Sequence, residues 1–375
     1  MQIIVLNTNF ENIGVLDTYK SLIWTDRYSS CGDFEIYVTA YSDILYELQQ
    51  GYYLWSDSSD HLMIIESVEI KSNVESGNYA TITGRSLESI LTRRIVWKKT
   101  VLNGKINSQI KKLITENIIS PIDSKRKISN FIFQDSTDPA IDAISIRAQF
   151  TGDTLYDAIK SVCDTVNIGF KITLNADNQF VFSLYSGKDR SYDQLDLPYI
   201  SFSPQFDNML NSDYSSTRKN FKNVTLVAGE EVNKDNTSYK LDSSVLEISS
   251  SDGSSALRRV YETGDTAASG LDRYELFTDA RDISSTVDEK TMSDDEYNAL
   301  LQQRGNEKLA ECKEVQAFDA EVETNLMYTF GKDYFMGDIV EFENEYGIQA
   351  KARVIEYIQS ISTDGNKFYP TFSII

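Results

Sequence analysis

The fold class is decided by residues 328–375, YTFGKDYFMGDIVEFENEYGIQAKARVIEYIQSISTDGNKFYPTFSII, which have the pattern of closely spaced β-strands. β-Branched and aromatic residues after Gly337-Asp338 predict a first strand. Residues 344–347 have the composition of a turn, and Thr363-Asp364-Gly365-Asn366 predicts a hairpin turn, because glycine can take the positive φ that such a turn needs. The stretch therefore predicts a packed antiparallel sheet.

Alternation within this stretch indicates which side chains face the core. Apolar and charged residues roughly alternate before the hairpin, which is typical of a sheet covered on one face. The expected inward positions there are Ala350, Ala352, Val354 and Ile358. In the last strand, KFYPTFSII, we expect paired backbone groups and partly buried apolar side chains at Phe368, Phe372, Ile374 and Ile375.

The length of 375 residues exceeds that of an ordinary domain and predicts two to four modules. A hydrophobic fraction of 41% and only 5 prolines indicate a folded, soluble protein. No segment approaches 18 uncharged apolar residues, and the start MQIIVLNTNFENIG lacks a basic region followed by an apolar core. We therefore expect neither a membrane span nor a secretory signal.

The net charge of −21 argues against a surface that grips nucleic acid, because phosphate binding needs clustered cations. An acidic wall would instead repel a duplex, as in a conduit through which DNA passes without sticking. Solubility explains the same charge and is the simpler interpretation.

The cysteine and histidine residues provide few candidates for a catalytic nucleophile or base. Cys31, Cys163 and Cys312 are scattered without C-x-x-C spacing, which favours buried or incidental thiols in a reducing cytoplasm. His61 is the sole histidine, so Ser-His-Asp or Cys-His chemistry would depend on it alone. It stands in SSDHLMIIESVEI, a polar turn before a strand, and we expect a surface histidine there.

The first hundred residues have further β-pattern. Phe34, Ile36 and Val38 share one face of a strand, and Trp24 on its partner is a candidate core aromatic. Residues 75–78 predict a hairpin turn between two further strands. The first hundred residues therefore predict a barrel-like β-module.

Helical patterns follow. Residues 85–127 hold 11 Lys/Arg against 3 Asp/Glu, and the apolar positions Ile106, Ile110, Leu113 and Ile114 have helical spacing. The lysines are most simply the solvated face of this helix; docking onto an acidic neighbouring ring and contact with nucleic acid are the alternatives. A second helix follows Asp153 or Thr154 as cap and ends at Gly169, before a hairpin that turns at residues 176–178.

Residues 230–300 are the most acidic part, with 17 acidic and 7 basic side chains in Ser/Gly/Asp-rich segments typical of long loops. No D-x-[DN]-x-[DN]-G calcium loop occurs, so we expect no metal. Ser293-Asp294-Asp295-Glu296 is a capping box that opens a helix through Lys313. The predicted buried side of this helix consists of Tyr297, Leu300, Leu301, Leu309 and Cys312.

Three classes of function remain open on these patterns. An enzyme needs a nucleophile with a base, a metal cluster or a poised carboxylate pair, and no such set has usable local spacing, although folding could bring carboxylates together. Asp189 and Arg190 are more simply a corner ion pair than an active-site pair. A carbohydrate-binding module is compatible with 22 Tyr and 3 Trp, yet these aromatics lie mostly at strand positions. A structural assembly protein accounts for more of the chain.

The chain resembles the tail hub proteins of siphophages, the Tal (tail-associated lysin) or Gp37-like family, which is related in fold to the baseplate hub of T-even phages. The resemblance rests on DYFMGDIVEFENEYGIQAKARVIEYIQSISTDGNKFYPTF near the end and on GKDRSYDQ with PYISFSPQFDNMLNSDYSSTRKNFKNVTLVAGEE in the middle. Near the start, it rests on the combination Tyr19, Leu22, Trp24, Arg27-Tyr28, Gly32 and Phe34-Glu35. Among these hubs, the chain looks most like the short Tal-type baseplate hub of lactococcal siphophages.

The resemblance implies an α+β, mainly β, multi-module tail hub fold with two barrel-like ring modules and two smaller α/β-containing modules. The expected division is 1–100, completed by 200–229, for the first ring module; 101–199 for an α+β module; 230–314 for an acidic module with long loops and a helix; and 315–375 for the second ring module. We expect the two ring modules to have similar shapes.

The implied function is structural. Such a hub is a homotrimer at the distal end of the tail tube, with a pseudo-sixfold ring, and it meets the distal tail protein ring, other baseplate proteins and the tape measure protein. DNA would pass through it without specific binding during genome ejection, and the hub serves host attachment. The resemblance implies a virion component that is made in the host cytoplasm, without cofactor, catalytic residues or stable membrane insertion. The chain stops where the hub stops, so we expect no enzyme; the alternative is a tail-associated cell-wall hydrolase or saccharide-binding module.

Overall fold

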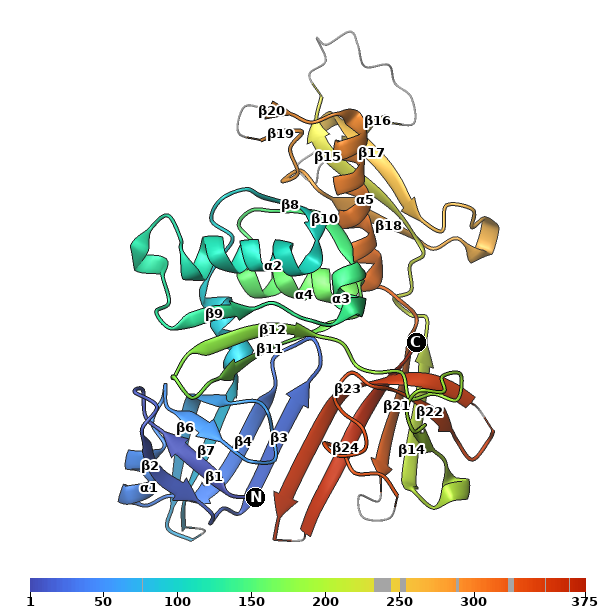
Figure 1. The fold of residues 1–375 in the computed structure, drawn as a ribbon. Helices are drawn as coiled ribbons and strands as arrows, with labels where there is room; N and C mark the ends of the chain where they lie inside the picture. The colour runs from blue at the N-terminus through green and yellow to red at the C-terminus, as the bar shows by residue number, and fades with distance from the viewer. Residues whose placement is uncertain are drawn as a thin grey trace.

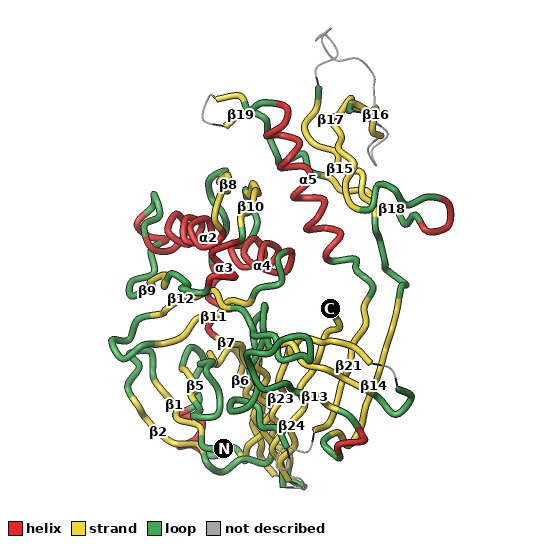
Figure 2. Tube along the Cα trace, turned by 45° about the vertical axis from the view of Figure 1, so that its right-hand side comes forward, coloured by secondary structure: helices red, strands yellow, loops and turns green. Residues whose placement is uncertain are grey.

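The computed structural model describes residues 1–75, 77–232, 244–249, 254–287, 290–322, 327–347, 349–363 and 365–375. Two β-rich halves lie side by side, an α+β layer covers one end of them, and a small sheet with one long helix lies farthest from them (Figure 1). Figure 2 shows from a second direction that the helices gather in these outer layers. The mainly β, α+β class expected from the sequence is confirmed.

One sheet passes through both β-rich halves. It contains 13 strands, and its main path pairs neighbours antiparallel throughout. In spatial order the path is β14 (Met209–Thr217), β21 (Val315–Val322), β24 (Gly365–Ile374), β23 (Gln349–Ser362), β3 (Ser21–Arg27), β4 (Asp33–Thr39), β7 (Gly77–Ser86), β6 (Met63–Asn73), β5 (Tyr53–Trp55), β1 (Ile3–Leu6) and β2 (Asn12–Leu16). Off this path, β22 (Ile339–Glu343) pairs with β23 and with β13 (Ser201–Phe202). These pairings leave the sheet open; within the described residues, β2 and β14 end its main path and β13 ends its side branch.

The halves meet where β3 pairs with β23, from Arg27 opposite Glu356 to Ser21 opposite Ser362. The short helix α1 (Ser42–Glu47) belongs to the N-terminal half. Strand alternation in this half follows the prediction, because Phe34, Ile36 and Val38 are buried on one face and Trp24 is fully buried beside them.

In the described ranges, the α+β layer consists of three helices and two small sheets. Its helices are α2 (Ile106–Ile114), continued by a π-helical turn (Thr115–Ile119), α3 (Pro139–Ala143) and α4 (Leu155–Thr165). Its strands are β8 (Thr100–Lys105) with β10 (Ser145–Phe150), and β11 (Gly169–Leu174) with β12 (Phe180–Tyr185) and β9 (Phe131–Gln134). Two 3₁₀ turns, Leu87–Arg93 and Ser124–Arg126, flank it. The predicted inward stripe of α2 is confirmed, since all four of its apolar positions are buried.

The outermost unit is a four-stranded sheet covered by one helix. The strands lie in the order β16 (Val245–Ser249), β17 (Ser255–Gly264), β15 (Val224–Glu231) and β18 (Glu275–Asp279), and the helix is α5 (Asp294–Ala310). A ribbon of β19 (Thr286–Val287) and β20 (Lys290–Thr291) precedes the helix, and 3₁₀ turns occur at Pro204–Phe206 and Gly270–Asp272. The capping box is confirmed: the Ser293 side chain accepts from the Glu296 N–H, and the Glu296 carboxylate accepts from the Ser293 N–H.

Helix ends differ slightly from the predictions. Thr154 caps α4 by accepting from the Asp157 N–H at 3.0 Å, as one of the two candidates. Asn167, rather than Gly169, takes the left-handed conformation after this helix, with φ of 55°. The helix α5 ends at Ala310 instead of Lys313; Tyr297, Leu300 and Leu301 are buried as predicted, whereas Leu309 and Cys312 are only half-buried because they lie at and beyond its last turn.

A β-bulge changes the inward positions of β23. Ala352 and Val354 are buried as predicted, but the register shifts between Val354 and Glu356. Because the bulge adds one residue, Tyr357 and Gln359 become the buried positions and Ile358 is only half-buried. Ala350 is also only half-buried.

Strand β24 lies inside the sheet, between β21 and β23. Phe372 is fully buried, and Phe368 and Ile374 are partly buried, as predicted. The prediction was wrong for Ile375, which follows the strand and is 60% exposed.

The prediction that residues 200–229 complete the N-terminal half was wrong. The strands β13 and β14 pair with β22 and β21, in the C-terminal half, and β15 belongs to the outer sheet. The physical reason is the side chain of Phe202, which is buried against Phe342 and Phe372 at ring-centroid distances of 5.3 and 5.6 Å. The predicted turns at 75–78 and 363–366 include Ser76 and Asp364, which lie outside the described residues; the flanking strands pair antiparallel, as expected.

Candidate functional site

Several clusters of polar and aromatic side chains connect the parts of this protein, and the first joins the two halves of the sheet. The Arg27 guanidinium on β3 contacts the carboxylate of Asp33 on β4 and that of Glu356 on β23, each at 2.5 Å. These two carboxylates come from opposite halves, so a single cation connects them. Burial alone would lower the pKa of Arg27, but both carboxylates raise it above its ordinary value, so the cation is retained.

Two tyrosines join the sheet to the α+β layer. The rings of Tyr28 and Tyr185 meet edge to face at 5.2 Å, and the Tyr185 hydroxyl donates to the Tyr28 carbonyl at 3.1 Å. Gly169 allows this approach, because a Cβ there would lie 2.6 Å from the Tyr28 ring and 2.7 Å from the Tyr185 ring. The role that the sequence assigned to Gly169 was therefore incorrect: it is needed for close packing rather than for ending a helix.

A buried ion pair holds the connection from β12 to the C-terminal half. Arg190 donates from Nε to Asp338 Oδ2 at 2.6 Å, and Asp338 Oδ1 accepts from the Lys188 N–H at 2.7 Å. Asp189, the predicted partner of Arg190, instead accepts from the Ser191 N–H at 2.8 Å. The predicted pair of Asp189 with Arg190 was therefore wrong: Arg190 does form an ion pair at this corner, but its carboxylate is that of Asp338, 148 positions further along the chain.

His61 is buried, and the prediction of a surface histidine was wrong. It is 5% exposed, and its Nδ1 lies 3.2 Å from Oε1 of the fully buried Glu88. Burial alone would lower the pKa of His61, but the charges of Glu88 and Asp26 outweigh this effect and raise the pKa to about 9. The imidazole is therefore a buried cation at neutral pH, and it keeps Glu88 ionised, with a pKa below its ordinary value.

This cluster lacks the geometry of a catalytic triad. Asp26 accepts from Ser59 Oγ at 2.8 Å and from Trp24 Nε1 at 3.2 Å, and burial raises its pKa. Glu88 also accepts from the Ile172 N–H of β11 at 2.7 Å, so the cluster ties the sheet to the α+β layer. His61, Glu88 and Asp26 are all enclosed by the protein, so a substrate has no direct path to them, and the cluster connects the sheet to the α+β layer.

The cysteines do not supply a nucleophile either. Cys31 is buried and burial raises the pKa of its thiol to about 12; Cys163 is fully buried with a raised pKa, and Cys312 is half-buried. All three are free thiols. Within the described part of the chain, no group of three His, Cys, Asp or Glu side chains could hold a metal ion. No helix in that part is both long enough and apolar enough to cross a bilayer.

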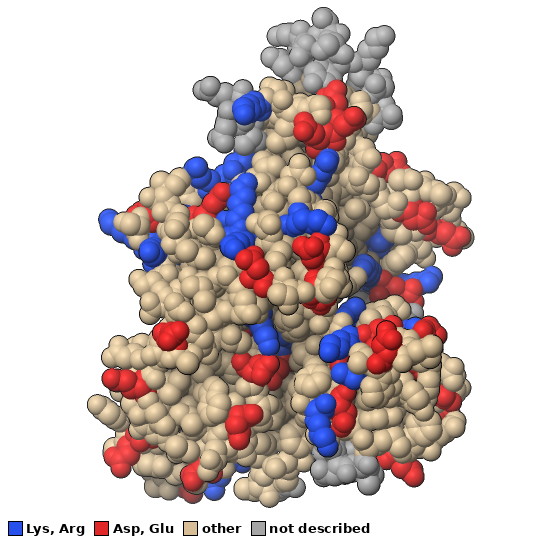
Figure 3. Space-filling model, in the orientation of Figure 1, with Lys and Arg blue, Asp and Glu red and all other residues tan. Residues whose placement is uncertain are grey.

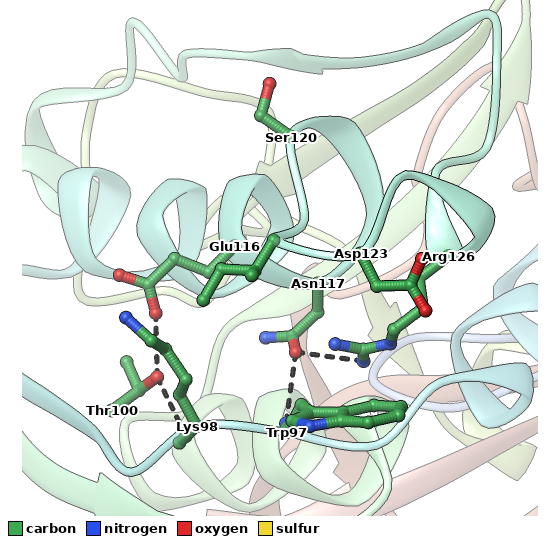
Figure 4. Close-up of a pocket in the computed structure, with 9 residues that line it drawn as sticks. Trp97, Lys98, Thr100, Glu116, Asn117, Ser120, Asp123 and Arg126 are labelled. Carbon is green, nitrogen blue, oxygen red and sulfur yellow. Dashed lines mark hydrogen bonds between the residues drawn. The ribbon is translucent and has the colours of Figure 1, made fainter.

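A cavity of about 450 Å³ lies in the α+β layer, between the segment before β8 and the end of α2 (Figure 4). Its lining residues are Trp97, Lys98, Thr100, Glu116, Asn117, Ser120, Ile122, Asp123 and Arg126. Trp97 is 61% exposed, and the Arg126 guanidinium lies 4.5 Å from the centre of its ring.

Asn117 organises this cavity. It is buried, its Oδ1 accepts from the Trp97 N–H at 3.3 Å and from Arg126 Nη2 at 3.2 Å, and its Nδ2 donates to the Leu113 carbonyl at 2.9 Å. Across the cavity, Glu116 Oε2 accepts from Thr100 Oγ1 at 2.7 Å. The sequence analysis missed these residues; the only signal that pointed to this region was the reversal of charge over residues 85–127. Figure 3 shows Lys and Arg side chains gathered over the part of the α+β layer that contains α2.

Comparison with solved structures shows the fold of phage tail proteins. The chain is similar to a prophage tail protein of Listeria monocytogenes EGD-e, with a TM-score of 0.54 and 11% identity over 100% of this chain and 94% of that one. It is similar to a tail protein of Neisseria meningitidis MC58, with a TM-score of 0.55 and 13% identity over 99% of this chain and 95% of that one. It is also similar to the 43 kDa tail protein of prophage MuSo2 from Shewanella oneidensis, with a TM-score of 0.57 and 10% identity over 99% of this chain and 98% of that one. No curated protein matched the chain.

The family follows from the sequence itself. The model of the Siphovirus ReqiPepy6 Gp37-like protein family matches residues 2–372, so the chain belongs to that family. The resemblance to the Gp37-like siphophage tail proteins is thereby confirmed.

Proposed function

We propose that the protein is a trimeric hub at the distal end of the tail tube, through which tape measure protein and DNA pass during infection. The observation that carries this proposal is the pairing of β3 with β23, because it fixes the two β-rich halves of one chain side by side in a single sheet. Three copies would place six such halves around an axis, which suits a ring that meets a sixfold tail.

The division into units supports a hub with projecting parts. We propose that residues 1–100 and 315–375 contribute the two ring units, the latter together with β13 and β14. We propose that residues 101–199 form one further unit and that β15 with residues 230–314 forms another; the elements labelled in these two units lie on the same side of the halves (Figure 1). In the trimer these units would project together from one face of the ring, with the distal tail protein ring and other baseplate proteins as partners.

Edge strands and charge support assembly around a passage. Within the described residues, β2 and β14 are the end strands of the sheet's main path, and edge strands offer unpaired backbone groups to a neighbouring chain. The net charge of −21 would let DNA pass a lumen without binding. We propose that the protein is synthesised in the host cytoplasm and becomes part of the virion.

The oligomeric state tests this proposal directly. Light scattering on the purified chain should give three times the mass of one chain, unchanged on tenfold dilution, because an assembled ring buries far more area than a transient contact. A monomer at every concentration would contradict the hub.

We further propose that the protein is not an enzyme. The carboxyl group of Glu307 is the candidate general acid on which this proposal can be tested. Burial raises the pKa of Glu307 on α5 to about 7, in the range of a general acid, although the Arg304 guanidinium lies 3.7 Å away and opposes the shift. The side chain is 4% exposed, so a glycan could not reach it. In a zymogram on cell walls, both the unaltered chain and Glu307→Gln should leave the gel uncleared. Clearing by the unaltered chain alone would establish a hydrolase.

A further inference from the structure

We propose that the cavity between Trp97 and Glu116 binds a saccharide, with one sugar ring against the indole and its hydroxyl groups on the polar lining. This is independent of the trimeric hub, because the cavity lies within the α+β layer of a single chain. The volume of about 450 Å³ is in the range of small-molecule sites, which are typically ~300–1,000 Å³.

The exposed indole is the first argument. Trp97 is 61% exposed, whereas Trp24 is fully buried in the core of the sheet. An indole combines a large apolar face with an N–H donor, which suits the C–H face and hydroxyl edge of a pyranose. Ile122, also exposed, adds an apolar wall on the same cavity.

Two contacts support the place of this indole in the cavity. Asn117 holds the backbone of Trp97, and the Arg126 guanidinium covers one face of its ring, so the sugar packs on the indole surface that remains exposed. Arg126 is itself held by bonds from Nη2 to the Ile95 carbonyl at 2.6 Å and to Asn117. Side chains that are held before a ligand arrives lose less conformational entropy on binding, so the held backbone of Trp97 and the held Arg126 favour affinity.

The charges of the lining favour hydroxyl groups over a strongly charged partner. Within the lining, Lys98 and Arg126 are balanced by Glu116 and Asp123, so the cavity itself offers an anion little net attraction. The same four side chains supply both donors and acceptors, and each sugar hydroxyl can use one of each. The Oε2 atom of Glu116 accepts a hydrogen bond from Thr100, which leaves the Oε1 atom to accept from a sugar hydroxyl.

The proposal is tested with the full chain on a glycan array that covers the common sugars in α and β linkage, with titration of the strongest glycan followed by tryptophan fluorescence. We expect saturable binding to at least one glycan. Trp97→Ala should weaken it by about tenfold or more, in line with the cost of removing an aromatic anchor from a binding site. Trp55→Ala is the matched control, because Trp55 is also exposed but lies on β5 in the sheet, and it should leave binding unchanged.

Glu116→Gln is a second variant that keeps the side-chain shape and an acceptor for Thr100, and it should weaken binding several-fold without changing the melting temperature. Absence of saturable binding to every glycan would overturn the proposal. Equal binding by Trp97→Ala and the unaltered chain would also overturn it, as would binding of poly-glutamate in place of any glycan. If Trp97→Ala changed only the mass of the assembly, the indole would be a contact between copies and the proposal would be wrong.

Discussion

Removal of residues 367–375 will leave a chain that cannot fold, because the deletion takes most of β24 out of the interior of the sheet. This strand pairs with β21 on one side and β23 on the other. Phe372 is fully buried against Phe342, with ring centroids 4.3 Å apart. Each large buried apolar side chain contributes roughly 1.5–3 kcal/mol, and the lost ladder bonds add to this, so the total approaches the ~5–15 kcal/mol that stabilises a whole domain.

The matched control is deletion of Ile375 alone. Its side chain is 60% exposed and lies beyond the strand, so the free energy of unfolding should change by no more than ~0.5 kcal/mol. Circular dichroism melting and light scattering on both variants compare them directly. The long deletion should give aggregate or no cooperative transition. A soluble, equally heat-resistant product with unchanged mass would mean that the sheet does not depend on β24.

The second large effect concerns His61. Replacement by leucine leaves Glu88 and Asp26 buried without their cation, and the loss of one partner from a buried charge cluster costs about 3–5 kcal/mol. The folded-state pKa of about 9 exceeds the ordinary value of 6.5, so folding favours the protonated imidazole. The stabilisation is therefore fully present below pH 6.5 and is lost as the pH rises through about 9; its size is on the order of 3 kcal/mol.

Urea denaturation at several pH values between 6 and 9.5 measures this effect. The difference in unfolding free energy between the unaltered chain and His61→Leu should shrink steadily as the pH rises across that range. Glu35→Gln is a suitable control, because Glu35 is exposed on β4 and its replacement should leave the pH profile unchanged. A constant difference across the range would show that His61 is neutral when folded.

Local patterns in the sequence predicted the elements well, for local physical reasons. The inward stripe of α2 and the alternation of β4 depend only on the 3.6- and 2-residue periods of helix and strand. The capping box before α5 needs only residues 293–296. Such features survive folding because each is satisfied within one element.

The same local patterns could not predict contacts between residues that are distant in the sequence. His61 stands in a polar local context, and its burial depends on Glu88 in a 3₁₀ turn and on Asp26 in β3. The bulge in β23 shifts the inward set by one residue, although nothing in the local composition marks it. The cavity at Trp97 likewise needs a turn of α2, the segment before β8 and Arg126, which only the fold brings together.

The pairing of β3 with β23 also affects the order in which the protein can mature. Arg27 and Glu356 are 329 positions apart, so on the ribosome β3 remains an unpartnered edge until nearly all of the intervening chain has emerged. Contacts of such long range form slowly, and exposed edges invite mispairing with other nascent chains. A partly translated chain therefore lacks the joined sheet, and the two halves come together only when synthesis is nearly complete.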